Sequence, residues 1–150
     1  DPKARGGWIG LTSRHTRGHL VRAVVEGVTF GMGQVLDLVR GLGVVVHKAR
    51  LGGGGARSAF WRQMQADVYG CPVAMTNTEE GPALGAALLG GVGAGVFGSV
   101  ESACAAAISE TGMLGPNAAA AAAYGSAREI YARLYGELRA EFGALSGLDR

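Results

Sequence analysis

The chain has 150 residues, which is enough for one domain with a sizeable core. Hydrophobic residues make up 48% and charged residues 17%, which excludes a disordered chain. A formal net charge of +2, without a dense run of Lys and Arg, argues against nucleic acid or a membrane surface as the partner. Glycine is the outlier, at 27 residues, and indicates tight turns and close approach of backbone to a ligand.

Cysteine usage favours a reduced, cytoplasmic environment. Cys71 and Cys104 stand far apart, outside any Cys-x-x-Cys pattern, and we expect them to be free thiols. No run of about eighteen apolar residues is present, and the opening Asp1-Pro2-Lys3 is unlike a signal peptide. Because the sequence opens abruptly, we expect it to be a domain of a longer polypeptide.

In chain order, the first expected element is a short strand over Gly7 to Leu11. Apolar residues spaced three or four apart from Leu20 to Val39 then predict a long amphipathic helix, and Gly41 follows its end. Val44 to Leu51 is rich in β-branched residues and predicts the next strand. That strand runs directly into four consecutive glycines, residues 52–55.

The second half continues the alternation of strands and helices. We expect a helix over Ser58 to Tyr69, a short strand over Val73 to Met75, and a helix over Pro82 to Ala94. Ser99 is suited to cap a short helix that ends at Ile108. An alanine-rich segment predicts a last helix over residues 117–145. The pattern indicates an α/β fold, with a short parallel or mixed sheet and flanking helices.

The glycine run carries the most chemical information, because it stands between a predicted strand and a predicted helix. Such a turn aims backbone N–H groups outward, and the following helix adds the positive end of its dipole. The result suits an anion such as phosphate. Neither the Gly-x-Gly-x-x-Gly pattern nor a P-loop fits residues 52–58. The residues alone therefore leave two interpretations open, a phosphate-binding turn and a flexible surface turn.

Several segments resemble the FGGY family of carbohydrate kinases. The second signature of that family is similar to two stretches, Gly6-Gly7-Trp8-Ile9-Gly10-Leu11 and His19-Leu20-Val21-Arg22-Ala23-Val24-Val25-Glu26. The adenosine segment resembles Leu51 to Ser58 with Phe60-Trp61-Arg62-Gln63 and Ala66-Asp67, and the next block resembles Glu79-Glu80-Gly81-Pro82-Ala83-Leu84-Gly85-Ala86-Ala87. The end of the chain, at Tyr124 and Tyr131 to Tyr135, resembles members that act on the ketose D-xylulose.

This resemblance implies the actin/Hsp70/hexokinase (ribonuclease H-like) fold, in which two lobes close over ATP and a sugar. Residues 1–150 would form the C-terminal, nucleotide-binding lobe, without its first strands. The implied partners are ATP, a ketose and the N-terminal lobe of the kinase. Gluconate and ribulose kinases share these blocks, so other sugars stay open.

The resemblance also implies a set of nucleotide-binding residues. Gly54, Gly55 and Ala56 would line the ribose and the α-phosphate. Arg57 would meet adenine or phosphate, or else face solvent. The full set of expected site residues is Gly53, Gly54, Gly55, Ala56, Arg57, Ser58 and Ala59. Ala59 departs from the family, because some members carry an asparagine near the adenine at that position.

The family's catalytic aspartate belongs upstream of this segment, so no catalytic residue is expected here. Asp1 belongs to the Asp-Pro-x-x-Arg-Gly phrase and not to the catalytic position. Phosphoryl transfer needs charge stabilisation by groups and Mg²⁺ from both sides of the γ-phosphate. We therefore expect Mg²⁺ to be held mainly by the other lobe, and the isolated chain to be inactive.

Other polar and aromatic residues favour structural roles. His15 and His19 could share a helix face as zinc ligands do, but no third ligand is evident. Glu79 and Glu80 could be interpreted as an acid/base pair. A simpler interpretation is that their carboxylates interact favourably with the positive end of the helix that follows. Trp8 and Trp61 are expected to pack rather than to stack on adenine.

A second hypothesis is a non-catalytic, oligomerising module. A lobe separated from its partner exposes apolar surface and an open sheet edge, so we expect self-association.

Overall fold

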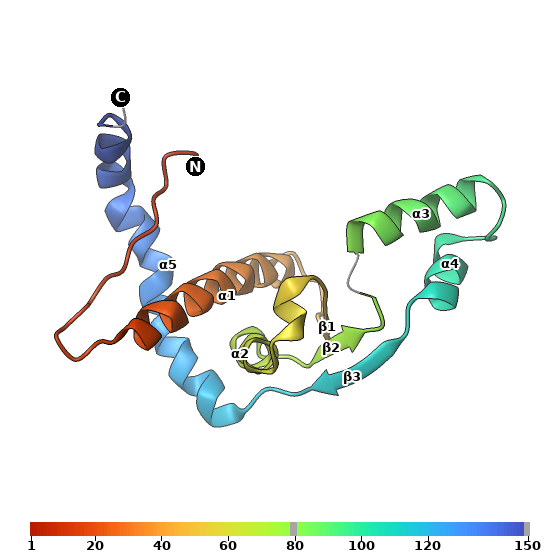
Figure 1. The fold of residues 1–150 in the computed structure, drawn as a ribbon, viewed down its shortest axis with the longest axis horizontal. Helices are drawn as coiled ribbons and strands as arrows, with labels where there is room; N and C mark the ends of the chain where they lie inside the picture. Colours follow the sequence, from red (N-terminus) through yellow and green to blue (C-terminus); the bar gives the residue numbers. More distant parts are fainter. Residues whose placement is uncertain (79–80, 149–150) are drawn as a thin grey trace. The chain divides into compact units, whose positions relative to one another are not determined.

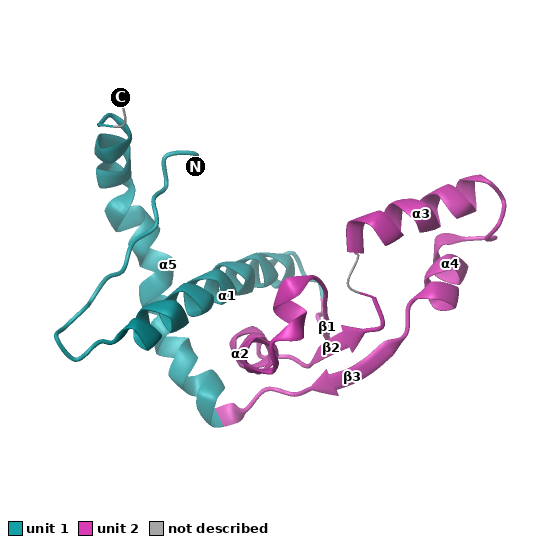
Figure 2. Ribbon diagram, in the orientation of Figure 1, with its two compact units in different colours: residues 1–44, 119–150 teal, residues 45–118 magenta. Residues whose placement is uncertain are grey.

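We describe a computed structural model of the chain for residues 1–78 and 81–148 (Figure 1). The chain divides into two compact units, residues 1–44 with 119–150 and residues 45–118 (Figure 2). Its elements, in order, are α1 (Arg17–Gly41), β1 (Ala49–Leu51), the 3₁₀ turn η1 (Gly54–Arg57), α2 (Ala59–Tyr69), β2 (Val73–Thr76), α3 (Gly81–Gly93), α4 (Val100–Ala107), β3 (Glu110–Leu114) and α5 (Ala118–Ser146).

The first unit is built on the packing of α1 against α5. Phe30 is buried and meets the rings of Tyr124 and Tyr131 edge to face, with centroid distances of 5.9 and 5.6 Å. The backbone of α1 comes close to the Tyr131 ring at Gly31, where an added Cβ would lie 3.6 Å from the Tyr131 hydroxyl oxygen. An ion pair between Asp37 and Arg128 ties the two helices together further along.

The second unit contains a three-stranded mixed sheet in the order β1-β2-β3. β1 pairs with β2 in parallel, and β2 pairs with β3 in antiparallel. The helix α2 carries a continuous buried segment, Met64 to Tyr69, and Val73 and Ala74 of β2 are fully buried as well. Removal of these side chains from water contributes about 25 cal/mol of folding free energy per Å² of apolar surface, and this is the main stabilisation of the unit.

The helices expected from the sequence are present at nearly the expected bounds, because amphipathic periodicity and end signals agreed. Ser58 caps α2 by accepting a hydrogen bond from the Trp61 amide at 3.3 Å, and Gly70 ends it in a left-handed conformation with φ of 63°. Ser99 caps α4 through the Ser102 amide at 3.2 Å, as expected. The fold class predicted from the sequence, an α/β fold with a mixed sheet and flanking helices, is confirmed.

Three strand assignments needed correction. Gly7 to Leu11 is not a strand; it lies in the irregular segment before α1, where the Trp8 indole donates to the Leu20 carbonyl at 3.2 Å. The strand expected over Val44 to Leu51 is limited to Ala49–Leu51, since β2 begins at Val73, directly after Pro72, and offers no earlier partner residues. The strand β3 was not predicted, because Glu110 and Gly112 are unfavourable for a strand and only pairing with β2 holds them there.

Cys71 and Cys104 are both free, as expected. None of the described helices is both long and apolar enough to span a bilayer.

Candidate functional site

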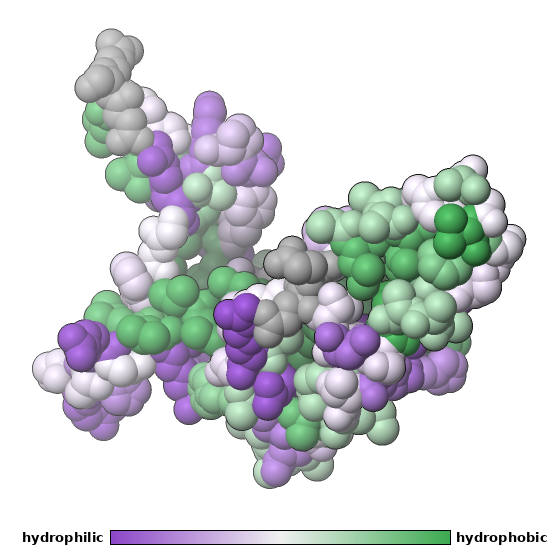
Figure 3. Space-filling view, turned by 45° about the vertical axis from the view of Figure 1, so that its right-hand side comes forward, coloured by the Kyte–Doolittle hydropathy of each residue, from purple (hydrophilic) through white to green (hydrophobic). Residues whose placement is uncertain are grey.

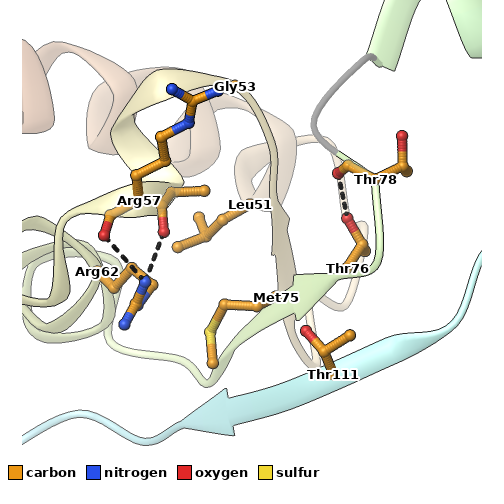
Figure 4. A pocket seen from close by; sticks show the side chains of 9 residues that line it. Leu51, Gly53, Arg57, Arg62, Met75, Thr76, Thr78 and Thr111 are labelled. Carbon is orange, nitrogen blue, oxygen red and sulfur yellow. Dashed lines mark hydrogen bonds between the residues drawn. The ribbon is translucent and has the colours of Figure 1, made fainter.

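The second unit contains a cavity of about 330 Å³ at the edge of its sheet where β1 and β2 end (Figure 4). Residues from both strand ends, the turn η1, the helix α2 and the start of β3 line it: Leu51, Gly53, Ala56, Arg57, Arg62, Met75, Thr76, Thr78 and Thr111. Parallel strands bring their carboxyl ends to one edge, and open α/β sheets bind ligands outside that edge. The topology alone therefore marks this cavity as the candidate ligand site.

The glycine run forms one wall of the cavity as a compact bend followed by a short 3₁₀ turn. Gly53 has φ of 72° and ψ of −170°, a backbone region open to glycine and strained for other residues. The first hydrogen bond of the turn runs from the Ala56 amide to the Gly53 carbonyl at 3.1 Å. The amides of Gly54 and Gly55 precede that bond, and the first amides of a helical turn have no acceptor within it. Gly52, Gly53 and Gly54 are exposed.

Two arginines approach the same turn from different elements. Arg57 is its last residue and is exposed, whereas Arg62 projects from α2 and is half-buried. Nη1 of Arg62 donates to the Ala56 carbonyl at 2.7 Å and to the Arg57 carbonyl at 3.3 Å (Figure 4). Nε of Arg62 is buried and has no hydrogen-bond partner among the described residues.

Hydroxyl groups line the opposite wall. The Thr76 hydroxyl donates to the Thr78 carbonyl at 3.0 Å, which folds the chain back as it leaves β2 (Figure 4). Thr111 adds a further side chain from β3. The described lining residues thus include two guanidinium groups and three hydroxyls and no carboxylate. This composition suits an anionic ligand that carries hydroxyl groups of its own, because guanidinium pairs with phosphate oxygens and threonine both donates and accepts.

The expected site residues fall into two groups. Gly53, Ala56 and Arg57 line the cavity, whereas Gly54, Gly55, Ser58 and Ala59 do not. Gly54 and Gly55 belong to the turn beside it, and the Ser58 hydroxyl is engaged in capping α2. Sequence reasoning missed Arg62 and the three threonines. Arg62 lay inside a recognised motif, whereas Thr76 and Thr78 lie at and just after the end of β2 and Thr111 lies in β3, with no shared sequence pattern.

The histidines weighed in the sequence have hydrogen-bonded roles and Trp61 packs, whereas Trp8, which was also expected to pack, is 53% exposed. Nδ1 of His19 accepts the Thr16 amide at 3.1 Å, and Nδ1 of His15 accepts the Thr12 amide at 2.9 Å. The described residues contain no group of three or more metal-ligating side chains. The Trp61 ring lies beside Gly55. The carboxyl pair proposed at positions 79 and 80 lies outside the described residues.

Comparison with known proteins agrees with this architecture. A family model described as "FGGY family of carbohydrate kinases, C-terminal domain" matches residues 1–94. The chain is 37% identical over 135 residues to a xylulose kinase of Bacillus subtilis, covering 90% of this chain and 27% of the relative. It is 40% identical over 139 residues to a xylulose kinase of Escherichia coli, covering 92% and 28%.

A solved structure is similar over nearly the whole chain. The xylulose kinase from Rhodospirillum rubrum superposes with a TM-score of 0.80 at 30% identity, covering 95% of this chain and 29% of that one. The chain therefore spans less than a third of the length of the relatives it matches.

The mixed α/β unit and its flanking helices superpose on a solved sugar kinase, so the chain has the actin/hexokinase-like fold. The chain belongs to the FGGY family of carbohydrate kinases and corresponds to its C-terminal domain.

Proposed function

We propose that the chain is the ATP-binding lobe of a cytoplasmic sugar kinase, which transfers the γ-phosphate of ATP to a hydroxyl of D-xylulose. The observation that carries the proposal is the cavity at the ends of β1 and β2, with Gly53, Ala56 and Arg57 in its wall. All three belong to the segment that resembles the adenosine segment of the family. A kinase for another ketose or for gluconate would use the same lobe, since the sugar-binding residues of the family lie mostly upstream.

The residues suit a nucleotide in chemistry and in steric openness. An added Cβ at Gly52, Gly53 or Gly54 would meet nothing within 4 Å, so a ligand can approach the backbone there. We assign the amides of Gly54 and Gly55, with Ala56, to the ribose and α-phosphate. Arg57, Ser58 and Ala59 would lie toward the adenine, and the wall of threonines would face the ribose hydroxyls.

ATP supplies the transferred phosphoryl group, and Mg²⁺ would neutralise its charge from the other lobe. Within this chain the residues bind and orient the adenosine end. Phosphoryl transfer requires groups on both sides of the γ-phosphate. The chain alone should therefore bind Mg·ATP weakly and saturably and give no turnover with D-xylulose.

The test is a calorimetric titration of the chain with Mg·ATP, followed by a coupled assay of ADP release with D-xylulose. Saturable binding without turnover is expected. The absence of saturable binding at millimolar nucleotide would contradict the nucleotide site. Turnover that co-purifies with the chain would contradict the division of labour between the lobes.

One exposed surface supports the expectation of a protein partner. The face of α1 opposite Phe30 carries large apolar side chains that are 47–71% exposed: Val21, Val24, Val28, Met32, Val35 and Leu38. Figure 3 shows a further gathering of hydrophobic residues over α3 and α4. We propose that the rest of the kinase polypeptide covers the α1 face, and that the chain alone self-associates through it. Sedimentation as a monomer at high concentration would contradict the self-association.

A further inference from the structure

We infer that Arg62 is a positioning residue that holds the nucleotide-binding turn in place from its inner side. The inference rests on the proposed function, since it concerns how the amides of that turn are presented to a ligand. Arg62 would act through the backbone of the turn rather than by direct chemistry on the nucleotide.

The need for such a residue follows from the break between η1 and α2. Ser58 has extended backbone angles, with φ of −81° and ψ of 114°, so the helical hydrogen bonding of the turn does not continue into α2. The last carbonyls of the turn, those of Ala56 and Arg57, are turned toward α2 instead. Nη1 of Arg62 meets both, at 2.7 and 3.3 Å (Figure 4). A charged donor makes a stronger hydrogen bond to a carbonyl than a neutral one does.

The position of Arg62 on α2 makes this contact rigid. Two residues further along begins the buried segment of the helix, from Met64 to Tyr69, which anchors α2 in the second unit. The turn itself is the opposite case, because Gly53, Gly54 and Gly55 carry no side chains that could restrict it. The Arg62 guanidinium thus connects the glycine turn to a helix that is buried from Met64 to Tyr69.

The positive charge of Arg62 also supports a role at the turn. In the second unit Glu110 pairs with Lys48 and Arg50, and no carboxylate in the described part of the chain pairs with Arg62. Its positive charge therefore remains in the cavity wall, where it favours an anion at the turn. Replacement by a neutral side chain would remove both the restraint on the turn and this charge, whereas lysine would restore the charge and at most one carbonyl contact.

The experiment uses three variants of the chain: Arg62→Met, Arg62→Lys and, as a control for the loss of one positive charge away from the cavity, Arg133→Met on α5. In the nucleotide-free chain, hydrogen exchange of the Ala56 amide reports on its bond to the Gly53 carbonyl. Arg62→Met should accelerate this exchange about tenfold and raise the dissociation constant for Mg·ATP by about tenfold, with little change in the unfolding midpoint. Arg62→Lys should recover part of the affinity and little of the exchange protection, and Arg133→Met should match the unaltered chain.

The hydrogen-exchange measurement tests the positioning role of Arg62, and the Mg·ATP titration tests the proposed function separately. Unchanged Ala56 exchange in Arg62→Met and Arg62→Lys overturns the positioning role, whatever the nucleotide does. Faster exchange in a chain that binds no Mg·ATP supports the positioning role and removes the nucleotide assignment. If Arg62→Met does not fold, Arg62→Lys decides, because exchange like that of the unaltered chain would overturn the role.

Discussion

The ring of Trp61 lies so close to Gly55 that a Cβ added to the glycine would come within 3.1 Å of the ring carbons Cε3 and Cζ3. This distance is shorter than an ordinary van der Waals contact between carbons, so even a methyl group at Gly55 would require the indole or the turn to shift by a few tenths of an ångström. The indole forms the support on which the turn rests.

Replacing Gly55 with valine should therefore displace either the turn or the indole. Overpacking of this kind costs about 1–3 kcal/mol, and we expect Mg·ATP affinity to fall by about tenfold or more. Calorimetric titration measures the affinity, and chemical denaturation measures the stability. Gly136→Ala on α5 is the control, since nothing lies within 4 Å of its added Cβ and it stands outside the cavity. A Gly55→Val variant that binds as well as this control would show that the contact with Trp61 is unimportant.

A substitution at Gly53 tests the backbone conformation of the turn rather than its side-chain packing. Its φ of 72° with ψ of −170° is a region that alanine enters only with strain, although space for a Cβ is free. We expect Gly53→Ala to lose about 1–3 kcal/mol of unfolding free energy. Gly52→Ala should be neutral or slightly stabilising, because its φ is ordinary and alanine restricts the unfolded chain. Equal stability of the two variants would contradict the conformation at Gly53.

Asp67 holds the connection that follows β3. Its side chain is buried, and Oδ1 accepts from Gln63 Nε2 at 2.8 Å and from the Asn117 amide at 2.7 Å. Asp67→Ala should cost roughly 2–3 kcal/mol, since it removes an ionic acceptor from two donors. Asp67→Asn keeps an oxygen acceptor and should cost less. Urea denaturation measures the unfolding free energy of both variants. Similar losses for the two would argue that acceptance of these hydrogen bonds by Oδ1 does not stabilise the connection.

Glu110 predicts a pH dependence of stability. The Lys48 ammonium at 2.6 Å and the Arg50 guanidinium at 3.0 Å hold the pKa of this carboxyl below its ordinary value of 4.5. Because the pKa is lower in the folded state, the stabilisation is present above the ordinary pKa and is lost as the pH falls through the folded value.

The matching variant is Glu110→Gln. It should unfold more easily than the unaltered chain near pH 7, and the difference should shrink as the pH falls below the ordinary carboxyl pKa of 4.5. Thermal unfolding across that range measures the effect. Since the carboxylate is exposed, added salt should shrink the difference at neutral pH. A difference that persists in acid would show that the substitution acts through packing and not through charge.

How much of the structure could be read from the sequence differs between helices and strands. The helix α2 carried its own signals, with Ser58 at one end and Gly70 at the other, and it formed as expected. The strand β3 carried none, since Glu110 and Gly112 are poor strand residues that are held by pairing with β2. Gly7 to Leu11 shows the converse, because an apolar run without a neighbouring strand in the described chain has nothing to pair with.

Sequence by itself determined the family, the helices and the position of the glycine turn, because periodicity, capping residues and contiguous motifs are properties of neighbouring residues. Only the tertiary structure decided that Arg62 meets the carbonyls of that turn and that Thr76 and Thr111 share a cavity with it. Those contacts depend on the parallel pairing of β1 with β2 and the antiparallel pairing of β3. Strand pairing joins residues far apart in the chain, and no local pattern records it.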